Sequence, residues 1–283
     1  MTYLCDMNKT IALTILSTLL LAFTSCEKFA LDESKGTDDV SDNSGNVNLS
    51  IDTSFSQAYS RLTWSFFSMG NKVKNINQTS DDKHFGQVSI ALDEGEYQWV
   101  VIAHNGLGHA TISKPEKVTF ASNKTTDTSY HYGSLQVEDE TIQQTINLDR
   151  AVALIRIHIK DAIPATAKRL KLYYTGGSST LDATTGYGCI NSRQTEEREM
   201  STDQKDYDIY TFPHSDGKKL HIVVTAYDAA GKTLATQELQ NVEVKKNQCT
   251  TCSLNLFGGE EDEGSGVSFE FDPSWEGQIH EDF

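Results

Sequence analysis

Hydrophobic and polar residues alternate along most of the chain, from about residue 46 to residue 257. In the segment 47–51, for example, the first, third and fifth residues are apolar and the two between them are polar. A period of two places every second side chain on the same face of a β-strand. No long stretch shows the 3.6-residue period of an amphipathic helix. The pattern therefore predicts an all-β protein.

The expected strands fall into two groups. The first group contains 47–51, 62–69, 88–92, 97–103, 118–120, 135–137 and 142–148, and the second contains 152–159, 170–175, 220–227 and 240–256. The segment 97–103 is apolar on both faces, which is typical of a strand that is buried on both sides. We interpret the charge-dense segment 191–206 as a loop.

Two short patterns recur in the same order in the two groups. Residues 66–70 resemble 173–177, and residues 99–105 resemble 222–228. Repetition of this kind favours tandem domains of one type over a single large sandwich. We expect an N-terminal domain over residues 46–148 and a C-terminal domain over residues 149–257.

The first 25 residues have the layout of a signal peptide. Lys9 supplies a positive charge, an apolar run of 13 residues follows from Ile11 to Phe23, and Thr24-Ser25-Cys26 ends it. The run is too short to remain as a membrane-spanning helix. We interpret residues 1–25 as a lipoprotein signal peptide and Cys26 as the lipidation site, where acyl chains such as palmitate would hold the chain at a membrane. The alternative is an ordinary secretory signal that leaves Cys26 as a plain thiol.

Two polar segments flank the predicted domains. Residues 26–45 are rich in Asp, Glu, Ser and Gly, which predicts a flexible tether. Residues 258–283 begin as an acidic linker and continue with a strand in which Val267, Phe269 and Phe271 alternate with polar residues. Two interpretations of this C-terminal strand stay open: it folds back on its own domain, or it is donated to a neighbour by strand addition.

The charge of the chain excludes some partners. The formal net charge is −16, and it is the same after residue 25 because Asp6 and Lys9 cancel. Nucleic-acid binding requires a basic surface, and peripheral binding to anionic lipid requires one as well. We therefore expect no nucleic-acid partner, and we expect any membrane attachment to come from the lipid on Cys26.

Candidate chemical groups are few, and we expect no catalytic, cofactor-binding or metal site. Cys249-x-x-Cys252 lies in a predicted strand, where its thiols point to opposite faces, and no further Cys or His pair completes a zinc site. His104 and His109 are interpreted as solvated residues at a hairpin tip, with a metal or sugar loop as the alternative. Trp275 is interpreted as packed on its own tail, with a sugar-stacking platform as the alternative.

The carboxylate clusters at 196–199 and 260–263 are interpreted as solvated charges in loops rather than as the paired acids of a glycosidase. No motif of a serine hydrolase, a zinc protease or a phosphate-binding loop is present in the sequence.

Several motifs together resemble the fimbrillin superfamily of Bacteroidales, which contains lipoprotein pilins and fimbrial anchoring and tip subunits. These motifs are the signal ending at Cys26, the strand 62–70, the segment 95–105, Leu148-Asp149-Arg150-Ala151-Val152-Ala153, and Lys245-Lys246-Asn247-Gln248-Cys249-Thr250 running into 254–257. The resemblance implies two tandem transthyretin-like β-sandwiches and a structural role in a cell-surface fimbria. It also implies adhesion, other fimbrial subunits as partners, an outer-membrane location, and a host or bacterial surface ligand that stays unidentified.

The resemblance implies assembly by strand donation into a groove on the next subunit. In stalk subunits an Arg-directed protease opens that groove by removing the first strand. Here no Arg lies between Cys26 and Arg61. This favours an anchor or an accessory or tip subunit, whereas the C-terminal strand is typical of a donor, so the position in the fimbria stays open. The alternative function is a surface glycan-binding lipoprotein, which requires exposed aromatic residues, yet Tyr97 and Trp99 lie in a strand that is expected to be buried.

Overall fold

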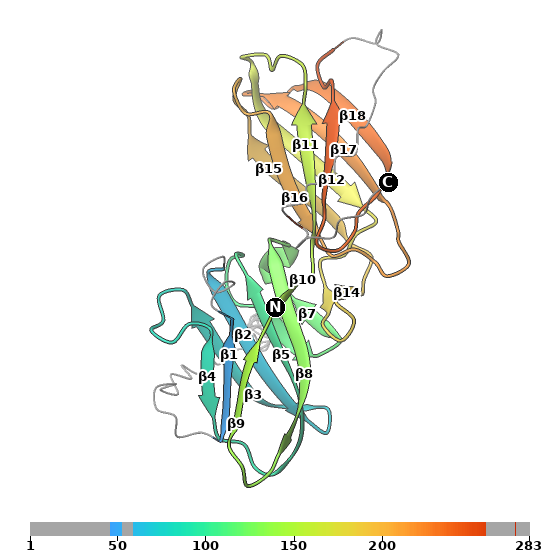
Figure 1. Ribbon diagram of the computed structural model, residues 1–283. Coiled ribbons are helices and arrows are strands. Elements are labelled where there is room, and N and C mark those ends of the chain that lie inside the picture. The colour runs from blue at the N-terminus through green and yellow to red at the C-terminus, as the bar shows by residue number, and fades with distance from the viewer. Residues whose placement is uncertain (1–45, 53–58, 259–274, 276–283) are drawn as a thin grey trace, which may run out of the picture. The chain divides into compact units, whose positions relative to one another are not determined.

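The computed structural model describes residues 46–52, 59–258 and 275. Within these residues the chain forms nineteen strands and a single short 3₁₀ helix, Ala121–Asn123 (Figure 1). The chain divides into two compact units, residues 1–38 and 39–283, and all described residues belong to the second. The all-β fold that the alternating pattern predicts is confirmed.

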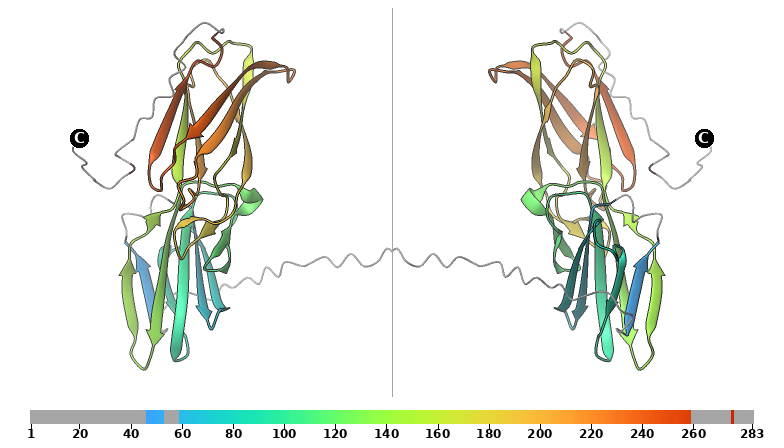
Figure 2. Two further views of the ribbon diagram at one scale, coloured as in Figure 1. Left: turned by 90° about the vertical axis from the view of Figure 1, so that its right-hand side faces the viewer. Right: turned by 90° about the vertical axis from the view of Figure 1, so that its left-hand side faces the viewer.

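The first group of strands forms two facing sheets (Figure 2). One sheet has the order β4(Gln87–Ile90)-β1(Val47–Ile51)-β9(Ile142–Ile146), and the other has the order β10(Asp149–Arg150)-β8(Thr128–Val137)-β5(Gly95–His104)-β2(Arg61–Ser68)-β3(Asn71–Thr79). Their inner faces share one hydrophobic core, in which Trp64, Phe66 and Trp99 are fully buried. The expected core side chains of residues 47–51 lie in this cluster as well.

The second group repeats the arrangement. A three-stranded sheet has the order β16(Asp206–Thr211)-β11(Ala153–Ile159)-β19(Cys249–Leu254), and a four-stranded sheet has the order β15(Arg193–Glu199)-β12(Ala167–Thr175)-β17(Leu220–Asp228)-β18(Thr233–Val242). Ile155, Ile157 and Ile159 of β11 alternate with polar residues and are fully buried in the core between the two sheets.

The two groups have the same topology. The first strand of each lies in the middle of its sheet, antiparallel to one neighbour and parallel to the last strand: β1 is parallel to β9, and β11 is parallel to β19. The recurring sequence patterns fall on equivalent central strands, β2 and β12 for one pattern and β5 and β17 for the other. The pairing differs by one residue, because Phe66 is opposite Trp99 whereas Tyr173 is opposite Val223.

A small fifth sheet takes strands from both groups. Its order is β14(Tyr187–Gly188)-β13(Leu181–Asp182)-β7(Lys117–Thr119)-β6(Thr111–Lys114). The hydrophobic cluster beside it contains Val100 and Ile102 of β5 together with Val118 and Leu181. This explains why β5 is apolar on both faces: one face fills the sandwich core, and the other packs against the small sheet. A domain boundary between residues 148 and 149 stays a prediction.

Our interpretation of 191–206 as a loop is wrong. Residues Arg193–Glu199 form β15, an edge strand that pairs with β12 from Arg169 to Thr175. Its polar side chains point outward and only Glu196 is buried. Strand β18 also begins earlier than we expected, at Thr233 rather than at residue 240, because in most of this edge strand only Leu239 and Val242 are buried. Both strands lie at an edge of one sheet, where the sequence can stay polar.

Candidate functional site

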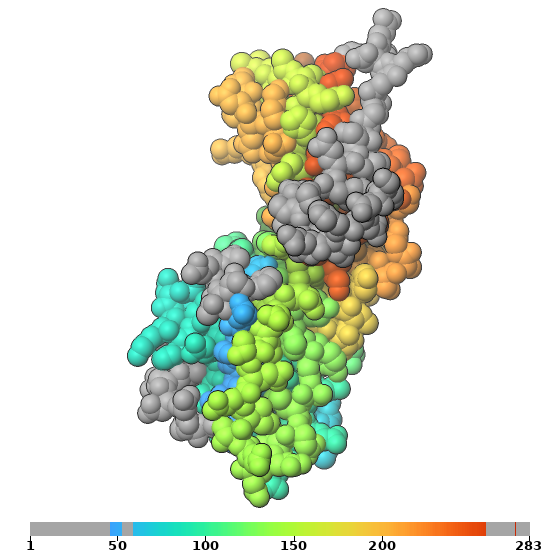
Figure 3. Space-filling view, viewed as in Figure 1, coloured from blue at the N-terminus to red at the C-terminus, as the bar shows by residue number. Residues whose placement is uncertain are grey.

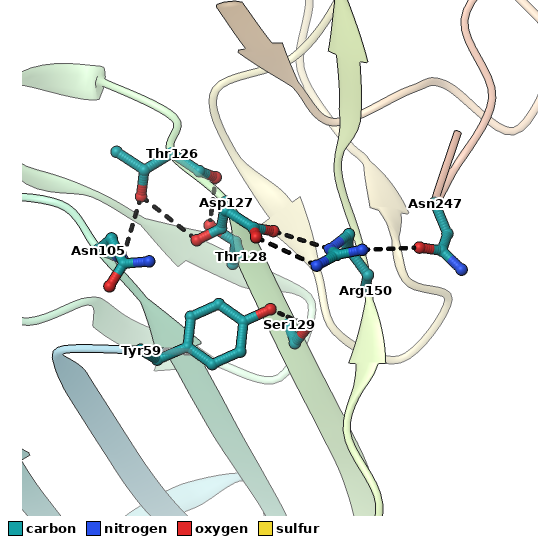
Figure 4. A network of polar contacts seen from close by, with 8 residues as sticks. All are labelled: Tyr59, Asn105, Thr126, Asp127, Thr128, Ser129, Arg150 and Asn247. Atoms are coloured by element: carbon teal, nitrogen blue, oxygen red, sulfur yellow. Dashed lines mark hydrogen bonds and ion pairs between the residues drawn. The ribbon is translucent and has the colours of Figure 1, made fainter. Parts of the chain in front are cut away.

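Arg150 is the centre of a polar network that joins the two groups of strands (Figure 4). It follows Asp149 in the short strand β10, which pairs with Tyr130 and Ser129 of β8. The guanidinium donates two hydrogen bonds to the Asp127 carboxylate, from Nε at 2.9 Å and from Nη2 at 3.2 Å. This bidentate geometry fixes the orientation of the planar guanidinium. A third nitrogen, Nη1, donates to the side-chain oxygen of Asn247 at 3.3 Å.

Asn247 comes from the loop between β18 and β19, far from Arg150 in the sequence. Its backbone has a φ of +59°, in the left-handed region that Asn tolerates better than most residues. Its backbone N–H donates to the carbonyl of Val152 at 2.9 Å. The loop of the second sandwich is therefore tied to the segment 150–152 by both a side chain and a backbone group.

The Asp127 side of the network is buried against the first sandwich. Tyr59 Oη and Ser129 Oγ are 2.7 Å apart, and Thr128 Oγ1 donates to the carbonyl of Thr126 at 2.8 Å. Burial and then the Asp127 charge raise the pKa of Tyr59, so its hydroxyl stays protonated. For Arg150, burial lowers the pKa, but Asp127 and Tyr59 together more than offset this and the pKa is raised. The Arg150 guanidinium therefore stays charged.

A second contact lies beside this network. The Lys246 ammonium lies 5.6 Å from the ring centroid of Tyr130 and 5.2 Å from that of Tyr187. These rings belong to β8 and to β14 of the small sheet. Cation–π contacts of this kind are worth about 0.5–1 kcal/mol when they are exposed and more when they are desolvated. The 245–250 motif thus contributes two consecutive residues, Lys246 and Asn247, to the junction.

Trp275 also reaches this junction. Its ring centroid is 4.2 Å from the Arg150 guanidinium carbon and 6.0 Å from the ring of Tyr210 in β16, at an interplanar angle of 30°. Trp275 is partly buried against the hydrophobic cluster of the junction. These contacts join Trp275 to the folded body, and the tail on either side of it lies outside the described residues, so packing on its own tail stays a prediction. The ring also does not lie open as a sugar-stacking platform.

Strand β1 is the central strand of the three-stranded sheet β4-β1-β9 in the first sandwich. Its residues pair with β4 on one side and with β9 on the other, and Leu49 has an exposed fraction of only 2%. In Figure 3, β1 is a narrow blue strip between β4 and β9. Removal of such a strand leaves the main-chain groups of its two neighbours, β4 and β9, unpaired and exposes the apolar core that the strand covers. The strand that fills a potential acceptor groove is therefore present and fully paired.

The remaining candidate residues have structural roles or lie outside the described residues. Cys26 and the predicted donor residues Val267, Phe269 and Phe271 lie in segments that the structure does not describe. Cys249 and Cys252 lie in β19 as predicted and are both buried, and Cys189 is exposed.

Two interpretations of polar residues are corrected. His104 is buried rather than solvated: Gly106 N–H donates to its Nδ1 at 3.0 Å, and its ring packs edge-on against Phe120. Glu196 is buried to an exposed fraction of 7% and accepts a hydrogen bond from Tyr174 Oη at 2.9 Å. Burial and the Glu196 charge raise the pKa of Tyr174, so its phenol stays protonated as the donor to Glu196. The carboxylate cluster at 260–263 lies outside the described residues.

The described part of the chain offers little to a metal or a small ligand. Within it, no three His, Cys, Asp or Glu side chains gather as metal ligands. The large hydrophobic side chains exposed there are Met69, Val73, Leu107, Ile190 and Leu234, and none is aromatic. A depression of about 730 Å³ lies at one end of the five-stranded sheet, between the β2–β3 turn and the strands β5 and β8. No described helix is both long enough and apolar enough to cross a membrane.

The described residues thus form two sandwiches of the same topology, joined by a polar junction. Comparison of the sequence with protein families gives a match to the fimbrillin-A associated anchor proteins Mfa1 and Mfa2 over residues 38–279. The chain belongs to this family of fimbrial anchor proteins. The expected relation to fimbrial subunits is confirmed. No curated protein sequence matches the chain.

Solved structures with a similar fold have low sequence identity. A candidate adhesin from Bacteroides ovatus is 13% identical, with 70% of this chain and 84% of that chain covered and a TM-score of 0.49. A candidate polysaccharide-binding protein from Bacteroides thetaiotaomicron is 12% identical, with 74% and 91% covered and a TM-score of 0.46. The fimbrial anchor protein Mfa2 from Porphyromonas gingivalis is 11% identical, with 73% and 89% covered and a TM-score of 0.43.

Proposed function

We propose that this protein is the membrane-anchored subunit of a cell-surface fimbria and that it contributes to adhesion. In this proposal an acylated Cys26 holds the chain at the outer membrane. The first sandwich keeps its own strand β1, and the C-terminal strand with Val267, Phe269 and Phe271 joins the neighbouring subunit. Membership of the fimbrial anchor family supports the class of function.

The observation that carries the anchor role is the position of β1. A subunit that accepts a donated strand needs a vacant place in a sheet, and here β1 fills the place between β4 and β9. Its side chains Val47, Leu49 and Ile51 are buried in the first core. No Arg between Cys26 and Arg61 offers an Arg-directed protease a site for removing it. A chain that keeps β1 accepts no strand at this place and therefore ends the series of subunits.

The C-terminal strand supports a connection in the other direction. Val267, Phe269 and Phe271 alternate with polar residues in the sequence, so in an extended strand they would place three apolar side chains on one face over about 13 Å. Burial of each large side chain in a partner groove stabilises the complex by roughly 1.5–3 kcal/mol, in addition to main-chain hydrogen bonds.

Two measurements on surface material test the anchor role. Intact-mass analysis of the chain purified from fimbriated cells is expected to give a polypeptide that begins at acylated Cys26 and contains β1. Labelling with an alkyne fatty acid is expected to mark the wild type and not Cys26→Ser. A mature chain that begins after Ile51, or equal labelling of both proteins, contradicts the proposal.

A charge substitution tests strand donation. Changing Phe269 and Phe271 together to Asp is expected to abolish incorporation into fimbriae while surface display remains. Ser268→Asp is the matched control, because it adds a charge to the same strand on the opposite face. Normal fimbriae with the double variant exclude the tail as the donor strand.

A further inference from the structure

Trp275 is the one residue after Gly258 that the structure describes, and its contacts within the described residues are with the folded body. The guanidinium of Arg150 lies over its ring at 4.2 Å, and the ring of Tyr210 stacks on it at 6.0 Å. A cation over an aromatic face and an offset aromatic stack are both favourable geometries. Arg150 and Tyr210 together form what we call the tryptophan site.

The tryptophan site is built from groups that are already fixed. Asp127 and Asn247 hold the Arg150 guanidinium with three hydrogen bonds. Tyr210 is paired with Leu154 in the ladder between β16 and β11. A site whose side chains are held in place loses little conformational entropy when a partner binds. The arrangement is therefore suited to receive a tryptophan side chain.

The segment that leads to Trp275 also starts from a fixed point. The Asp161 carboxylate accepts backbone N–H groups from Leu256, Phe257 and Gly258, at 3.0, 2.6 and 2.8 Å. The chain thus leaves β19 at a defined place and is held again at Trp275.

We propose that the tryptophan site is a docking site for the C-terminal tail of the same molecule, with Trp275 as the anchoring residue. The docked tail stays with the chain that carries it until a neighbouring subunit takes up the strand. This second part rests on the proposed role of the tail as a donor strand. Because Trp275 follows that strand directly in the sequence, donation requires that Trp275 leaves the site.

The occupant is the chain's own tryptophan rather than that of a second copy. Sixteen residues separate Gly258 from Trp275. A connection of this length gives an effective concentration on the order of millimolar, far above that of a second copy in dilute solution. Mass action therefore favours docking of Trp275 within one molecule over docking of Trp275 from a second copy.

Fluorine NMR of the full chain labelled with 5-fluorotryptophan tests the docking. The chain has three tryptophans, so the spectrum contains three resonances, and Trp275→Phe identifies the one from Trp275. We expect this resonance in the wild type to be displaced from its position in denaturant. Tyr210→Leu is expected to move it to the denatured position while the resonances of Trp64 and Trp99 stay in place.

Tyr227→Leu is the matched control. Tyr227 also lies under an arginine, Arg169, at 4.8 Å, but it has no contact with Trp275. This variant is expected to leave the Trp275 resonance unchanged. A Trp275 resonance at the denatured position in the wild type, or one that does not respond to Tyr210→Leu, overturns the docking site. A position that changes with protein concentration over a hundredfold dilution overturns docking within one molecule.

Release is tested separately. Trp275→Ala removes both the Arg150 contact and the Tyr210 contact. Loss of at least ~1 kcal/mol corresponds to fivefold or more in an equilibrium constant, so this variant is expected to speed incorporation into fimbriae at least about fivefold. If docking is seen but incorporation does not accelerate, the link between docking and assembly is wrong. If the double variant with Phe269→Asp and Phe271→Asp is also incorporated into fimbriae normally, the tail is not a donor strand. The NMR result on docking is independent of that outcome.

Discussion

His104 ends β5 and is buried, with an exposed fraction of 1%. Its Nδ1 accepts a hydrogen bond from the Gly106 N–H, and its buried Nε2 has no hydrogen-bond partner in the described residues. Burial, followed by the charges of His109 and Arg61, lowers the pKa of His104 to about 4. A neutral imidazole is therefore part of the folded structure.

This lowered pKa predicts sensitivity to mild acid. The unfolded chain binds the proton with a pKa near 6.5, whereas the folded chain binds it only near pH 4. The contribution of His104 to stability is therefore fully present above about pH 6.5 and is lost as the pH falls towards 4, with a total of roughly 3 kcal/mol. Urea denaturation of wild type and His104→Gln between pH 7 and pH 4 measures this. The variant is expected to lose much of the acid dependence, and parallel curves contradict the prediction.

Gly186 is a residue that the junction requires. Its φ is +73°, and an added Cβ would lie 1.9 Å from Tyr130 Oη and 3.0 Å from Lys246 Nζ. Gly186→Ala is expected to lower the free energy of unfolding by about 1–3 kcal/mol, because it combines backbone strain with displacement of Tyr130.

Gly231→Ala is the matched comparison for this substitution. Gly231 has a similar φ of +82°, but nothing lies within 4 Å of the added Cβ. Equilibrium denaturation of the two variants separates the strain from the steric contact. Equal losses of stability mean that the close approach to Tyr130 has no energetic consequence.

At the scale of the element, β1 is the strand on which the first sandwich depends. Leu49→Ala in this central strand is expected to lower the free energy of unfolding by about 2–5 kcal/mol, because it leaves a cavity in the core. Val73→Ala in the edge strand β3 is expected to change it by less than about 0.5 kcal/mol, since Val73 is exposed. Chemical denaturation measures both. A small loss for Leu49→Ala indicates that β1 is only loosely held.

The strands that could be predicted from the sequence are those with one buried face. In β11 the apolar residues alternate regularly with polar ones, and the observed strand, Ala153–Ile159, matches the expected strand 152–159. Edge strands such as β15 and β18 bury few side chains, so their sequences carry no such pattern. The strands of the small sheet are two to four residues long. Of these, only β7 overlaps an expected strand, 118–120, and the other three are too short for a period to be recognised.

The junction could not have been predicted in the same way. Asp127, Arg150 and Asn247 are far apart in the sequence, and only the fold brings them together. Arg150 and Asn247 lie in two of the segments that carry the fimbrillin resemblance, 148–153 and 245–250. Nothing in the sequence of these segments indicates that the two side chains form a hydrogen bond. The buried state of His104 was missed for a related reason, since Phe120 covers it from a distant part of the chain.

At the scale of the whole molecule, the described residues of both sandwich cores all lie before the tail. Both clusters end at or before Phe257. A chain that ends at Gly258 keeps the hydrogen bonds to Asp161 and, among the described residues, loses only the partly buried Trp275. Its melting temperature is expected to fall by no more than a few degrees, since a contact of ~1 kcal/mol shifts it by about 2–4 °C in a domain of this size. Calorimetry tests this, and loss of cooperative unfolding indicates that the tail is part of the second sandwich.

The parallel pairing of β1 with β9 has a mechanical consequence. If the membrane end pulls on the chain before Val47 and the rest of the fimbria pulls on the chain after Ile146, the two neighbouring strands are drawn in opposite directions along their length. The five residue pairs between them then bear the load together, in shear, rather than opening one after another like a zipper. Strand β4 adds a second ladder on the other side of β1. A chain anchored through its first strand can therefore resist tension with ordinary hydrogen bonds, because the topology distributes the force over all of them at once.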